Sequence, residues 1–546
     1  MKIKLALVCL LLMIINFVYS VDVRIDPLVL INQGLVRGQK SDDGQYSTFL
    51  GIPYAQVDLN NPFGVSPALI HPGFGDEIFE ANDGSIECTQ NGYIAIPLRV
   101  AENGIQSLDC LRLNIFVPGS ASTKRPLPVL VYIPGGAFTR RSARSEGIPY
   151  LVGHDVVVVM INYRLGPYGF LCLDSPLASG NQGLKDQYEA LRWVSENIAS
   201  FGGDPHNVTL GGKSAGSASV LYHLYSSKEK LFNKVIALAG VPQCESLFVE
   251  GDADAAIKLA NHLGLNTNST EQALTLLTQT SPDLVYAAFE ELNLRLMPCK
   301  EKSFDGIESF IQTTPFFLTN EIKIRNTPIL IGHSSNEVFR PIETIYGDDY
   351  FNDPFTIRIQ KNFNLSQDDL NNAVEIVRHF YIGDETISSK VYQNLERYDS
   401  DYVFIHPMHR TINNLLKENA SPVFQYLFKF QDQIKNFHGI EGSYLFKLPS
   451  LELTDEEKLI SDRMTQLLAN FVKYGNPTPH ATEFLPVIWE PITKDKRPYL
   501  VLDRELSLDH RVYKERMSFW DLFYLKYGEY RIQRSSANYL INYWKR

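Results

Sequence analysis

No part of this 546-residue sequence is enriched in basic residues. The chain has 51 lysines and arginines against 62 aspartates and glutamates, and its formal net charge is −11. A nucleic-acid-binding surface needs clustered cations that displace phosphate counterions, so this composition excludes nucleic acids as partners. The sequence also lacks internal repeats, low-complexity tracts and flexible linkers, and we therefore expect residues 21–546 to form a single domain.

Only one long apolar run occurs, at the N-terminus. Leu5–Phe17 follows Lys2 and Lys4 and precedes a small-residue site at residues 18–20. This order is typical of a signal peptide, and the run is too short to span a bilayer comfortably. We therefore predict a signal peptide over residues 1–20, a secreted, extracellular protein, and no membrane anchor. The C-terminal stretch YLINYWKR is neither a retention signal nor a lipid-attachment tail.

Cysteine is scarce, and its number is odd after the signal peptide. Cys9 would leave with that peptide, and the mature chain would keep Cys88, Cys110, Cys172, Cys244 and Cys299. Disulfides form in the oxidising compartments that secreted proteins pass through. At least one of these five cysteines must therefore stay free or pair outside the chain.

Four N-x-S/T sequons become usable for glycosylation if the chain is secreted. They are Asn207, Asn268, Asn364 and Asn419. Asn207 is the weakest of the four predictions, because it lies at the entrance to a predicted strand.

Apolar, β-branched runs alternate with helical patterns along the chain. LPVLVYI (127–133) and KVIALAG (234–240) are typical of buried strands, whereas residues 186–201 and 455–475 have helical spacing. Strands that alternate with helices form a sheet with both faces covered. We predict an α/β fold with a large, mostly parallel central sheet and helices on both faces.

A G-x-S-x-G pattern follows one of the predicted strands. Gly212–Gly216 places Ser214 where a strand would turn sharply into a helix, which is the nucleophile elbow of serine hydrolases. A serine hydroxyl needs a histidine to accept its proton and an acid to orient that histidine. Glu337 and His438 follow Ser214 in the chain order of this arrangement, each after a predicted strand.

Stabilisation of the oxyanion would come from backbone N–H groups. Gly135 and Gly136 follow an earlier predicted strand, and Ala215 follows the serine, so we predict these three as donors. Each signal is weak alone, since a lone glutamate or histidine in a loop usually lies at the surface. The agreement of strand context and chain order makes the set persuasive. This chemistry requires no cofactor and no metal ion, and we expect none.

A resemblance to a known family rests on several longer stretches. They are FLGIPYA (49–55), DCLRLNIFVP (109–118), INYRLGPYGFL (161–171), residues 180–216, IGHSSNE (331–337) and FWDLFY (519–524). On these stretches the chain resembles the type-B carboxylesterase/cholinesterase family, and specifically a secreted esterase of insect type. The resemblance implies an α/β-hydrolase fold and hydrolysis of carboxylic esters through an acyl-serine intermediate. It places the catalytic triad on Ser214, Glu337 and His438.

The resemblance also implies supporting residues. It assigns the oxyanion donors to Gly135, Gly136 and Ala215, and it matches Ser219 to a buried serine that hydrogen-bonds the triad acid. It implies a disulfide between Cys88 and Cys110.

The remaining cysteines carry a further expectation. We predict a second bridge between Cys244 and Cys299, because both fall where the acyl pocket would lie. Cys172 is then expected to be a buried free thiol.

Two departures from the family pattern bear on the chemistry. Pro134 stands where the family has a histidine, but the N–H donors belong to the two glycines that follow it. Lys213 stands where the family has a glutamate, beside Ser214. We predict that Lys213 forms an ion pair with Glu441, because an unpaired ammonium beside the histidine would be costly. The alternative is that the lysine extends to solvent water.

The pattern of a cholinesterase is absent. The loop between Cys88 and Cys110 has no tryptophan to hold a quaternary ammonium, and Arg340 and Lys213 would repel choline. The sequence therefore predicts a carboxylesterase, not a cholinesterase, that acts on neutral or anionic lipophilic esters. Two alternatives stay open, namely a catalytically silent binding or adhesion protein and an enzyme that sequesters ligands stoichiometrically.

Overall fold

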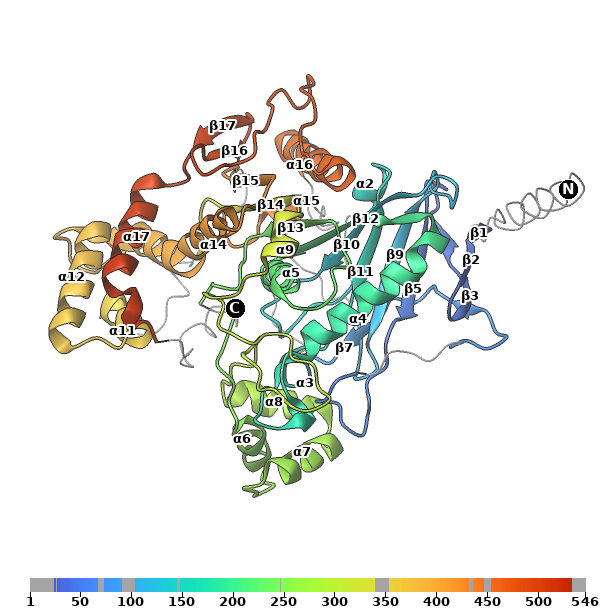
Figure 1. Ribbon diagram of the computed structural model, residues 1–546, viewed down its shortest axis with the longest axis horizontal. Coiled ribbons are helices and arrows are strands. Elements are labelled where there is room, and N and C mark those ends of the chain that lie inside the picture. Colours follow the sequence, from blue (N-terminus) through green and yellow to red (C-terminus); the bar gives the residue numbers. More distant parts are fainter. Residues whose placement is uncertain are drawn as a thin grey trace, which may run out of the picture.

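An eleven-stranded sheet forms the centre of the protein in the computed structural model (Figure 1). The structure describes residues 24–25, 27–66, 73–90, 104–144, 148–245, 247–338, 353–431, 436–445 and 453–532. The segment predicted as a signal peptide and Arg340 lie outside these residues. In spatial order the strands are β17 (Ser507–His510), β16 (Pro498–Leu502), β15 (Val423–Phe428), β14 (Ile329–Ser334), β13 (Lys234–Leu238), β12 (Gly203–Lys213), β10 (Leu127–Ile133), β11 (Val157–Ile161), β9 (Arg112–Pro118), β5 (Tyr46–Pro53) and β4 (Gln39–Lys40).

The middle of this sheet is parallel and its edges are antiparallel. From β16 across to β11, each strand runs parallel to the next one. β17, β9, β5 and β4 pair in the antiparallel sense at the two sides. The parallel strands place their carboxyl ends along one edge of the sheet.

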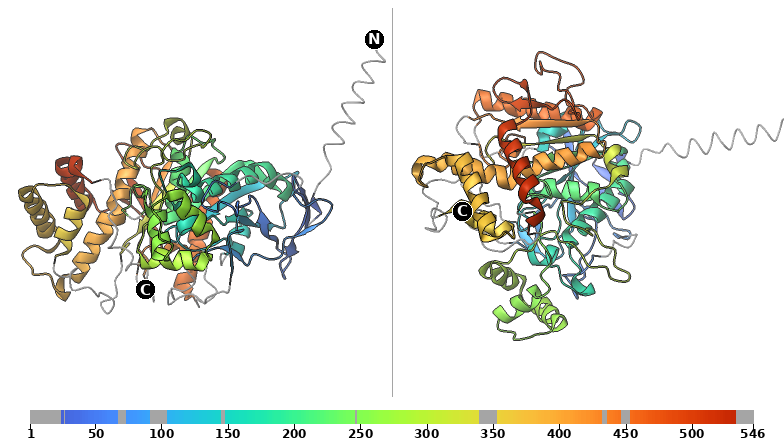
Figure 2. Two further views of the ribbon diagram at one scale, coloured as in Figure 1. Left: turned by 90° about the horizontal axis from the view of Figure 1, so that it is seen from below. Right: turned by 60° about the vertical axis from the view of Figure 1, so that its left-hand side comes forward.

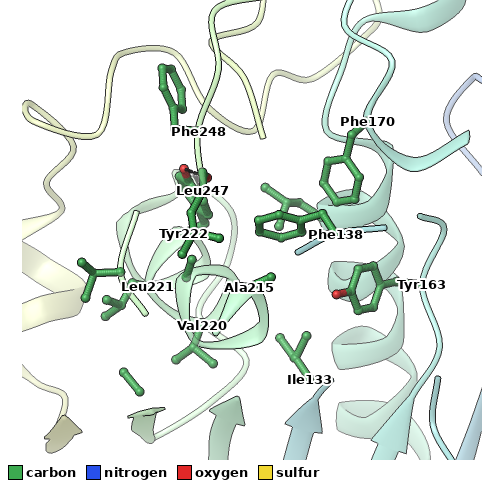
Figure 3. Close-up of a cluster of buried hydrophobic side chains, with 14 of the residues drawn as sticks. Ile133, Phe138, Tyr163, Phe170, Ala215, Val220, Leu221, Tyr222, Leu247 and Phe248 are labelled. Atoms are coloured by element: carbon green, nitrogen blue, oxygen red, sulfur yellow. Dashed lines mark hydrogen bonds between the residues drawn. The ribbon is translucent and has the colours of Figure 1, made fainter. Parts of the chain in front are cut away.

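Helices cover both faces, and the burial of β10 shows how the sheet divides the core. Val129, Val131 and Ile133 pack into the larger core cluster, which also takes residues of α4 (Gln182–Asn197) and α5 (Ala215–Tyr225). Leu130 and Tyr132 point the other way, into the cluster that contains α16 (Asp455–Tyr474). Successive side chains of a strand alternate between faces, so a strand that is apolar throughout is buried on both. Figure 3 shows Ile133 beside α5 residues in the larger cluster.

The other elements lie around this core. The further helices are α2 (Ile148–Val152), α3 (Gly166–Phe170), α6 (Ala255–His262), α7 (Thr270–Gln279), α8 (Pro282–Glu291), α9 (Glu321–Arg325), α11 (Pro354–Asn362), α12 (Gln367–Ile382), α13 (Tyr392–Ser400), α14 (His406–Lys417), α15 (Glu441–Leu445) and α17 (Lys514–Tyr527). The small sheets consist of β1 (Arg24–Ile25), β2 (Leu28–Ile31), β3 (Gly34–Arg37) and β6 (Phe79–Glu80), and of β7 (Ile86–Cys88) and β8 (Ile105–Ser107). Figures 1 and 2 show α6, α7 and α8 as one group beside the sheet and α11, α12 and α17 as another.

The predicted fold class is confirmed. The run at 127–133 forms β10 with those bounds, and the helical pattern at 455–475 forms α16. The pattern at 186–201 forms most of α4 and a short 3₁₀ turn after it. Among the described residues, no helix combines the length and the apolar character that crossing a bilayer requires.

The cysteines pair differently from one of the two predictions. The structure contains the disulfide between Cys88 and Cys110, and a second one joins Cys172 to Cys299 with the Cα atoms 6.6 Å apart. Cys244 is a buried free thiol. The predicted Cys244–Cys299 bridge is therefore wrong, as is the free thiol predicted for Cys172.

The physical reason is a close approach that only the folded chain makes. Gly180, with φ +103°, lies so near the second bridge that a Cβ there would be 2.7 Å from the Cys299 sulfur and 2.8 Å from the Cys172 sulfur. The loop that begins at Cys172 thus turns back over residue 299. Cys244 lies instead in the turn after β13, where burial raises the pKa of its thiol to about 12.

Peptide mapping without reduction should identify two bridged pairs, Cys88–Cys110 and Cys172–Cys299. Cys244 should react with an alkylating reagent only after denaturation, because its thiol is buried. Cys172→Ser should lower the free energy of unfolding by roughly 2–5 kcal/mol, because it opens a long loop in the unfolded chain. Cys244→Ser is the control that leaves both bridges intact. A Cys244–Cys299 peptide would contradict this pairing.

Candidate active site

Ser214 lies at a sharp turn between a strand and a helix. β12 ends at Lys213, α5 begins at Ala215, and Ser214 has φ 58° and ψ −121°. A residue other than glycine adopts such angles only where its surroundings enforce them. Here the Ser214 N–H donates to the Leu238 carbonyl of β13 at 2.8 Å, which holds the turn against the sheet.

Three glycines make room for this turn. A Cβ at Gly212 would lie 2.4 Å from the backbone of Gly216, and one at Gly216 would lie 2.1 Å from the Ile133 carbonyl oxygen. A Cβ at Gly240 would lie 2.4 Å from the Ser214 carbonyl oxygen. Real Cβ atoms do not approach backbone atoms this closely, so strand, turn and helix could not pack in this way with alanine there. The two glycines of the G-x-S-x-G pattern are therefore required sterically.

The structure brings the predicted serine, histidine and glutamate into one hydrogen-bonded chain. His438 Nε2 lies 2.7 Å from Ser214 Oγ, and His438 Nδ1 lies 2.5 Å from Glu337 Oε2. The residues follow β12, β14 and β15, and these parallel strands end at the same edge of the sheet. Ser214 is 4% exposed and Glu337 1% exposed. A donor–acceptor chain of this kind can move a proton from the serine hydroxyl to the imidazole.

The buried Glu337 carboxylate is held by two neighbours. Burial raises the pKa of this carboxyl group, but the hydrogen bond and charge of His438, together with His333 and the Ser334 N–H, hold the net pKa below its ordinary value. The Ser334 N–H donates to Glu337 Oε1 at 2.7 Å, and the Ser334 hydroxyl lies 3.1 Å from the same oxygen and 2.9 Å from the Asn336 carbonyl oxygen. Glu337 is therefore an ionised acceptor at neutral pH.

Ser219 does not hydrogen-bond the acid, and that prediction is wrong. Its hydroxyl donates to the Ala215 carbonyl at 3.0 Å and accepts from the Gln187 side chain of α4 at 3.2 Å. Ser219 lies on the side of α5 that packs against α4, which explains its contact with Gln187. Its own proton is donated to the carbonyl four residues earlier in the same helix. Ser334 holds Glu337 instead. Ser334 stands three residues before Glu337 in the sequence, and this spacing could have identified it as the residue that holds the acid.

The predicted oxyanion donors adjoin the serine. A Cβ at Gly135 would be 2.4 Å from the Lys213 carbonyl oxygen and 3.3 Å from Ser214 Cβ, so this loop passes directly beside the turn. Gly136 has φ +101°, which favours glycine. In the described part of the chain, the N–H groups of Gly135, Gly136 and Ala215 donate no hydrogen bond to protein. They are thus available to a bound oxyanion.

Two further residues support this geometry. The Pro134 carbonyl accepts a hydrogen bond from the Tyr163 hydroxyl at 2.9 Å, which fixes the loop just before the glycines. Phe404 stacks on the His438 ring with the ring centroids 4.3 Å apart. Sequence analysis missed Phe404. It lies in a π-helical segment that is distant in the sequence from the other site residues, and this segment has no recognisable motif.

The predicted Lys213–Glu441 ion pair is not what the structure shows. Lys213 Nζ donates to the Gly439 carbonyl at 3.1 Å. Glu441 Oε1 accepts from the Tyr426 hydroxyl at 2.9 Å, and Glu441 Oε2 accepts no hydrogen bond from any residue that the structure describes. The prediction is therefore wrong in its contact, although the lysine charge still acts on Glu441 from nearby. The alternative, in which Lys213 extends to solvent water, is also wrong, because its ammonium donates to the Gly439 carbonyl.

Glu441 is a neutral acid under ordinary conditions. Its side chain is 0% exposed, and burial together with the charge of Glu337 raises its pKa to about 8. Lys213 lowers this pKa, but by less than burial and Glu337 raise it. Two carboxyl groups thus lie close together, and only Glu337 is ionised at neutral pH.

The sequons differ in accessibility. Asn268, Asn364 and Asn419 are exposed. The Asn207 side chain is engaged by Lys234 and by the Lys473 carbonyl, and Thr209 of the same sequon is fully buried in β12. A glycan on Asn207 would break these contacts. Within the described residues, no group of His, Cys, Asp and Glu side chains is arranged to hold a metal ion.

Comparison with known proteins places this geometry in context. The model of the carboxylesterase family matches residues 25–520. Esterase E4 of Myzus persicae is 28% identical over 86% of this chain and 89% of its own length. Esterase B1 of Culex pipiens is 29% identical over 90% and 97% respectively, and human carboxylesterase 5A is 30% identical over 87% and 84%.

Glu441→Gln should make the protein more stable at alkaline pH. The folded protein keeps the Glu441 proton up to about pH 8, whereas the unfolded chain loses it near the ordinary glutamate pKa. The unfolded state therefore binds fewer protons between these values, and Glu441 reduces stability progressively as the pH rises. Glutamine keeps an acceptor for Tyr426 and removes this penalty.

Thermal unfolding at pH 4 and pH 8 measures the effect. The difference between variant and wild type should be near zero at pH 4 and favour the variant at pH 8. Glu456→Gln is a matched control, because Glu456 is an exposed surface carboxylate paired with Arg504. Destabilisation of Glu441→Gln at pH 8 would mean that an ionised Glu441 holds the site together.

Proposed function

This chain belongs to the carboxylesterase family and is a carboxylic ester hydrolase, and we propose that it works through an acyl intermediate on Ser214. The single observation that carries the proposal is the hydrogen-bonded chain from Ser214 through His438 to Glu337, at 2.7 Å and 2.5 Å. A catalytically silent relative would have no need of a strained serine aligned with a histidine and a buried carboxylate.

In the proposed mechanism each of these groups has a step. His438 Nε2 takes the proton as Ser214 Oγ bonds to the ester carbonyl carbon, and Glu337 holds the Nδ1 proton and stabilises the imidazolium. The N–H groups of Gly135, Gly136 and Ala215 stabilise the oxyanion. The imidazolium then protonates the leaving alcohol as the C–O bond breaks. Water, deprotonated by His438, attacks the acyl-serine and releases the acid.

The proposed substrates are neutral or anionic lipophilic esters. Lys213 adjoins Ser214 and places a cation near the site, and the segment between Cys88 and Cys110 contains no tryptophan. An ammonium repels a cationic choline group and tolerates a neutral or anionic one. Cation–π binding of choline is strongest on the face of an indole ring, and this segment has none.

We further propose that the protein is secreted as one domain over residues 21–546 after removal of residues 1–20. Three exposed sequons, at Asn268, Asn364 and Asn419, and two disulfides support passage through an oxidising, glycosylating compartment. Small-molecule esters are the expected ligands, and no cofactor has a role in this reaction.

A tagged fluorophosphonate should label wild-type protein at Ser214, because only an activated serine attacks this phosphorus centre readily. Ser214→Ala should remove both the label and hydrolysis of a short-chain aryl ester, with the thermal unfolding midpoint retained. Glu337→Gln and His438→Ala should each lower kcat by roughly 10⁴-fold or more, and the triple variant should be little worse, because the three act as a unit. Unlabelled wild-type protein that is fully folded would refute the proposal.

Choline esters should be poor substrates. The value of kcat/KM for butyrylcholine should be roughly tenfold or more below that for a neutral butyrate ester, a difference of about 1.4 kcal/mol in transition-state stabilisation. Raising the salt concentration should narrow the gap if Lys213 repulsion contributes. Equal values for the two esters at low salt would contradict the proposed substrate class.

A further inference from the structure

The Lys213 side chain connects the nucleophile turn with the loop that carries His438. Its ammonium donates to the carbonyl of Gly439, the residue after His438, at 3.1 Å. Lys213 itself immediately precedes Ser214. One side chain therefore joins the neighbours of the two residues between which the proton must move.

The lysine stem fills space left by one glycine of the histidine loop and one glycine of α15, the helix that follows this loop. A Cβ at Gly439 would be 2.9 Å from Lys213 Cδ, and a Cβ at Gly442 would be 2.7 Å from the same atom. Gly439 has φ +68°, a left-handed conformation that favours glycine. Side chains at either position would thus displace the lysine, so the loop and the lysine are fitted to each other.

The other end of Lys213 is anchored in the sheet. Its backbone pairs with Leu238 of β13, and its carbonyl oxygen packs against Gly135 of the oxyanion loop. A residue whose backbone is fixed in a central strand provides a rigid base for a hydrogen bond from its side chain. The hydrogen bond from Lys213 therefore fixes the histidine loop relative to β12, the same strand that positions Ser214.

We propose that Lys213 is a positioning residue that holds His438 at hydrogen-bond distance from Ser214. The inference rests on the proposed function, because it assigns Lys213 a part in the activation of that serine. Proton transfer depends steeply on the separation of the two atoms, and a displacement of about 1 Å costs roughly 100-fold in rate. The hydrogen bond to Gly439 is charge-assisted, which makes it a stronger restraint than a neutral one.

The charge of Lys213 has a second consequence for the site. Among the described groups, burial and the charge of Glu337 raise the pKa of Glu441, and the Lys213 ammonium lowers it.

Lys213→Met tests this restraint, because methionine keeps most of the stem and removes the ammonium. The readout is the rate of Ser214 labelling by a fluorophosphonate between pH 5 and 9, which requires no knowledge of the natural ester. We expect a rate lower by roughly tenfold at its plateau, because His438 is no longer held at hydrogen-bond distance from Ser214. For an aryl ester, kcat should fall while KM changes little.

Lys234→Met is the matched control. Lys234 also lies in the central sheet and its ammonium also binds a described group, the Asn207 side chain. It begins β13 and pairs with Thr209, at the opposite end of the strands from Ser214. The labelling rate and its pH profile should match those of the wild type, even where the unfolding midpoint falls.

A wild-type labelling rate and pH profile in folded Lys213→Met would overturn the proposal and leave the lysine with a packing role. Failure of wild-type protein to label would instead overturn the proposed function, so the two failures are distinguishable. Should Lys213→Met not fold, Lys213→Gln keeps an N–H donor and removes the charge. Its amide donor lies on a shorter stem than the ammonium, so labelling should again be slower than in the wild type, and a wild-type rate would overturn the proposal in the same way.

Discussion

The parallel register of β12, β13, β14 and β15 is the constraint on which the site depends. Ser214, Glu337 and His438 all follow strands of this set, and the register aligns the ends of those strands at one edge of the sheet. Residues separated by more than 200 positions in the sequence thus come within hydrogen-bond distance. Burial of the sheet on both faces fixes the register, because a slip of one residue would exchange the side chains that pack into the two core clusters, and closely packed cores do not accommodate such an exchange.

The protonation states of the two buried acids follow from the number of hydrogen-bond donors that each one has. Glu337 receives hydrogen bonds from His438 and Ser334 and is ionised despite its burial. Glu441 is equally buried, but one of its oxygens accepts no hydrogen bond within the described parts of the chain, and it keeps its proton at neutral pH. A single negative charge therefore faces the histidine from these two groups. The lysine beside the serine does not neutralise Glu441 by direct contact, and its ammonium is used to hold the histidine loop.

Much of the fold and part of the site could be predicted because they follow from local rules. β-branched runs that alternate with helical patterns require a covered parallel sheet, and β10 and α16 formed where these patterns lie. The glycines of the G-x-S-x-G pattern identify a turn too tight for a Cβ, and the distances at Gly212 and Gly216 give the reason. Glu337 and His438 could be named because each is the acid or the base that follows a strand in the expected order.

Other features depended on which distant segments meet, and the sequence does not encode this in any local pattern. Cys299 pairs with Cys172 and not with Cys244, because the loop through Gly180 turns back over residue 299. Ser334 holds Glu337 where Ser219 was predicted, because the hydroxyl of Ser219 faces α4. Steric rules act between neighbouring residues, so they can be read from the sequence alone. The sequence by itself therefore determined the strands, the strained turn and the identity of the reacting groups. Hydrogen bonds, disulfides and ring contacts act through space, so the partners of Cys172, Glu337, His438 and Lys213 were decided only when the tertiary structure brought those segments together.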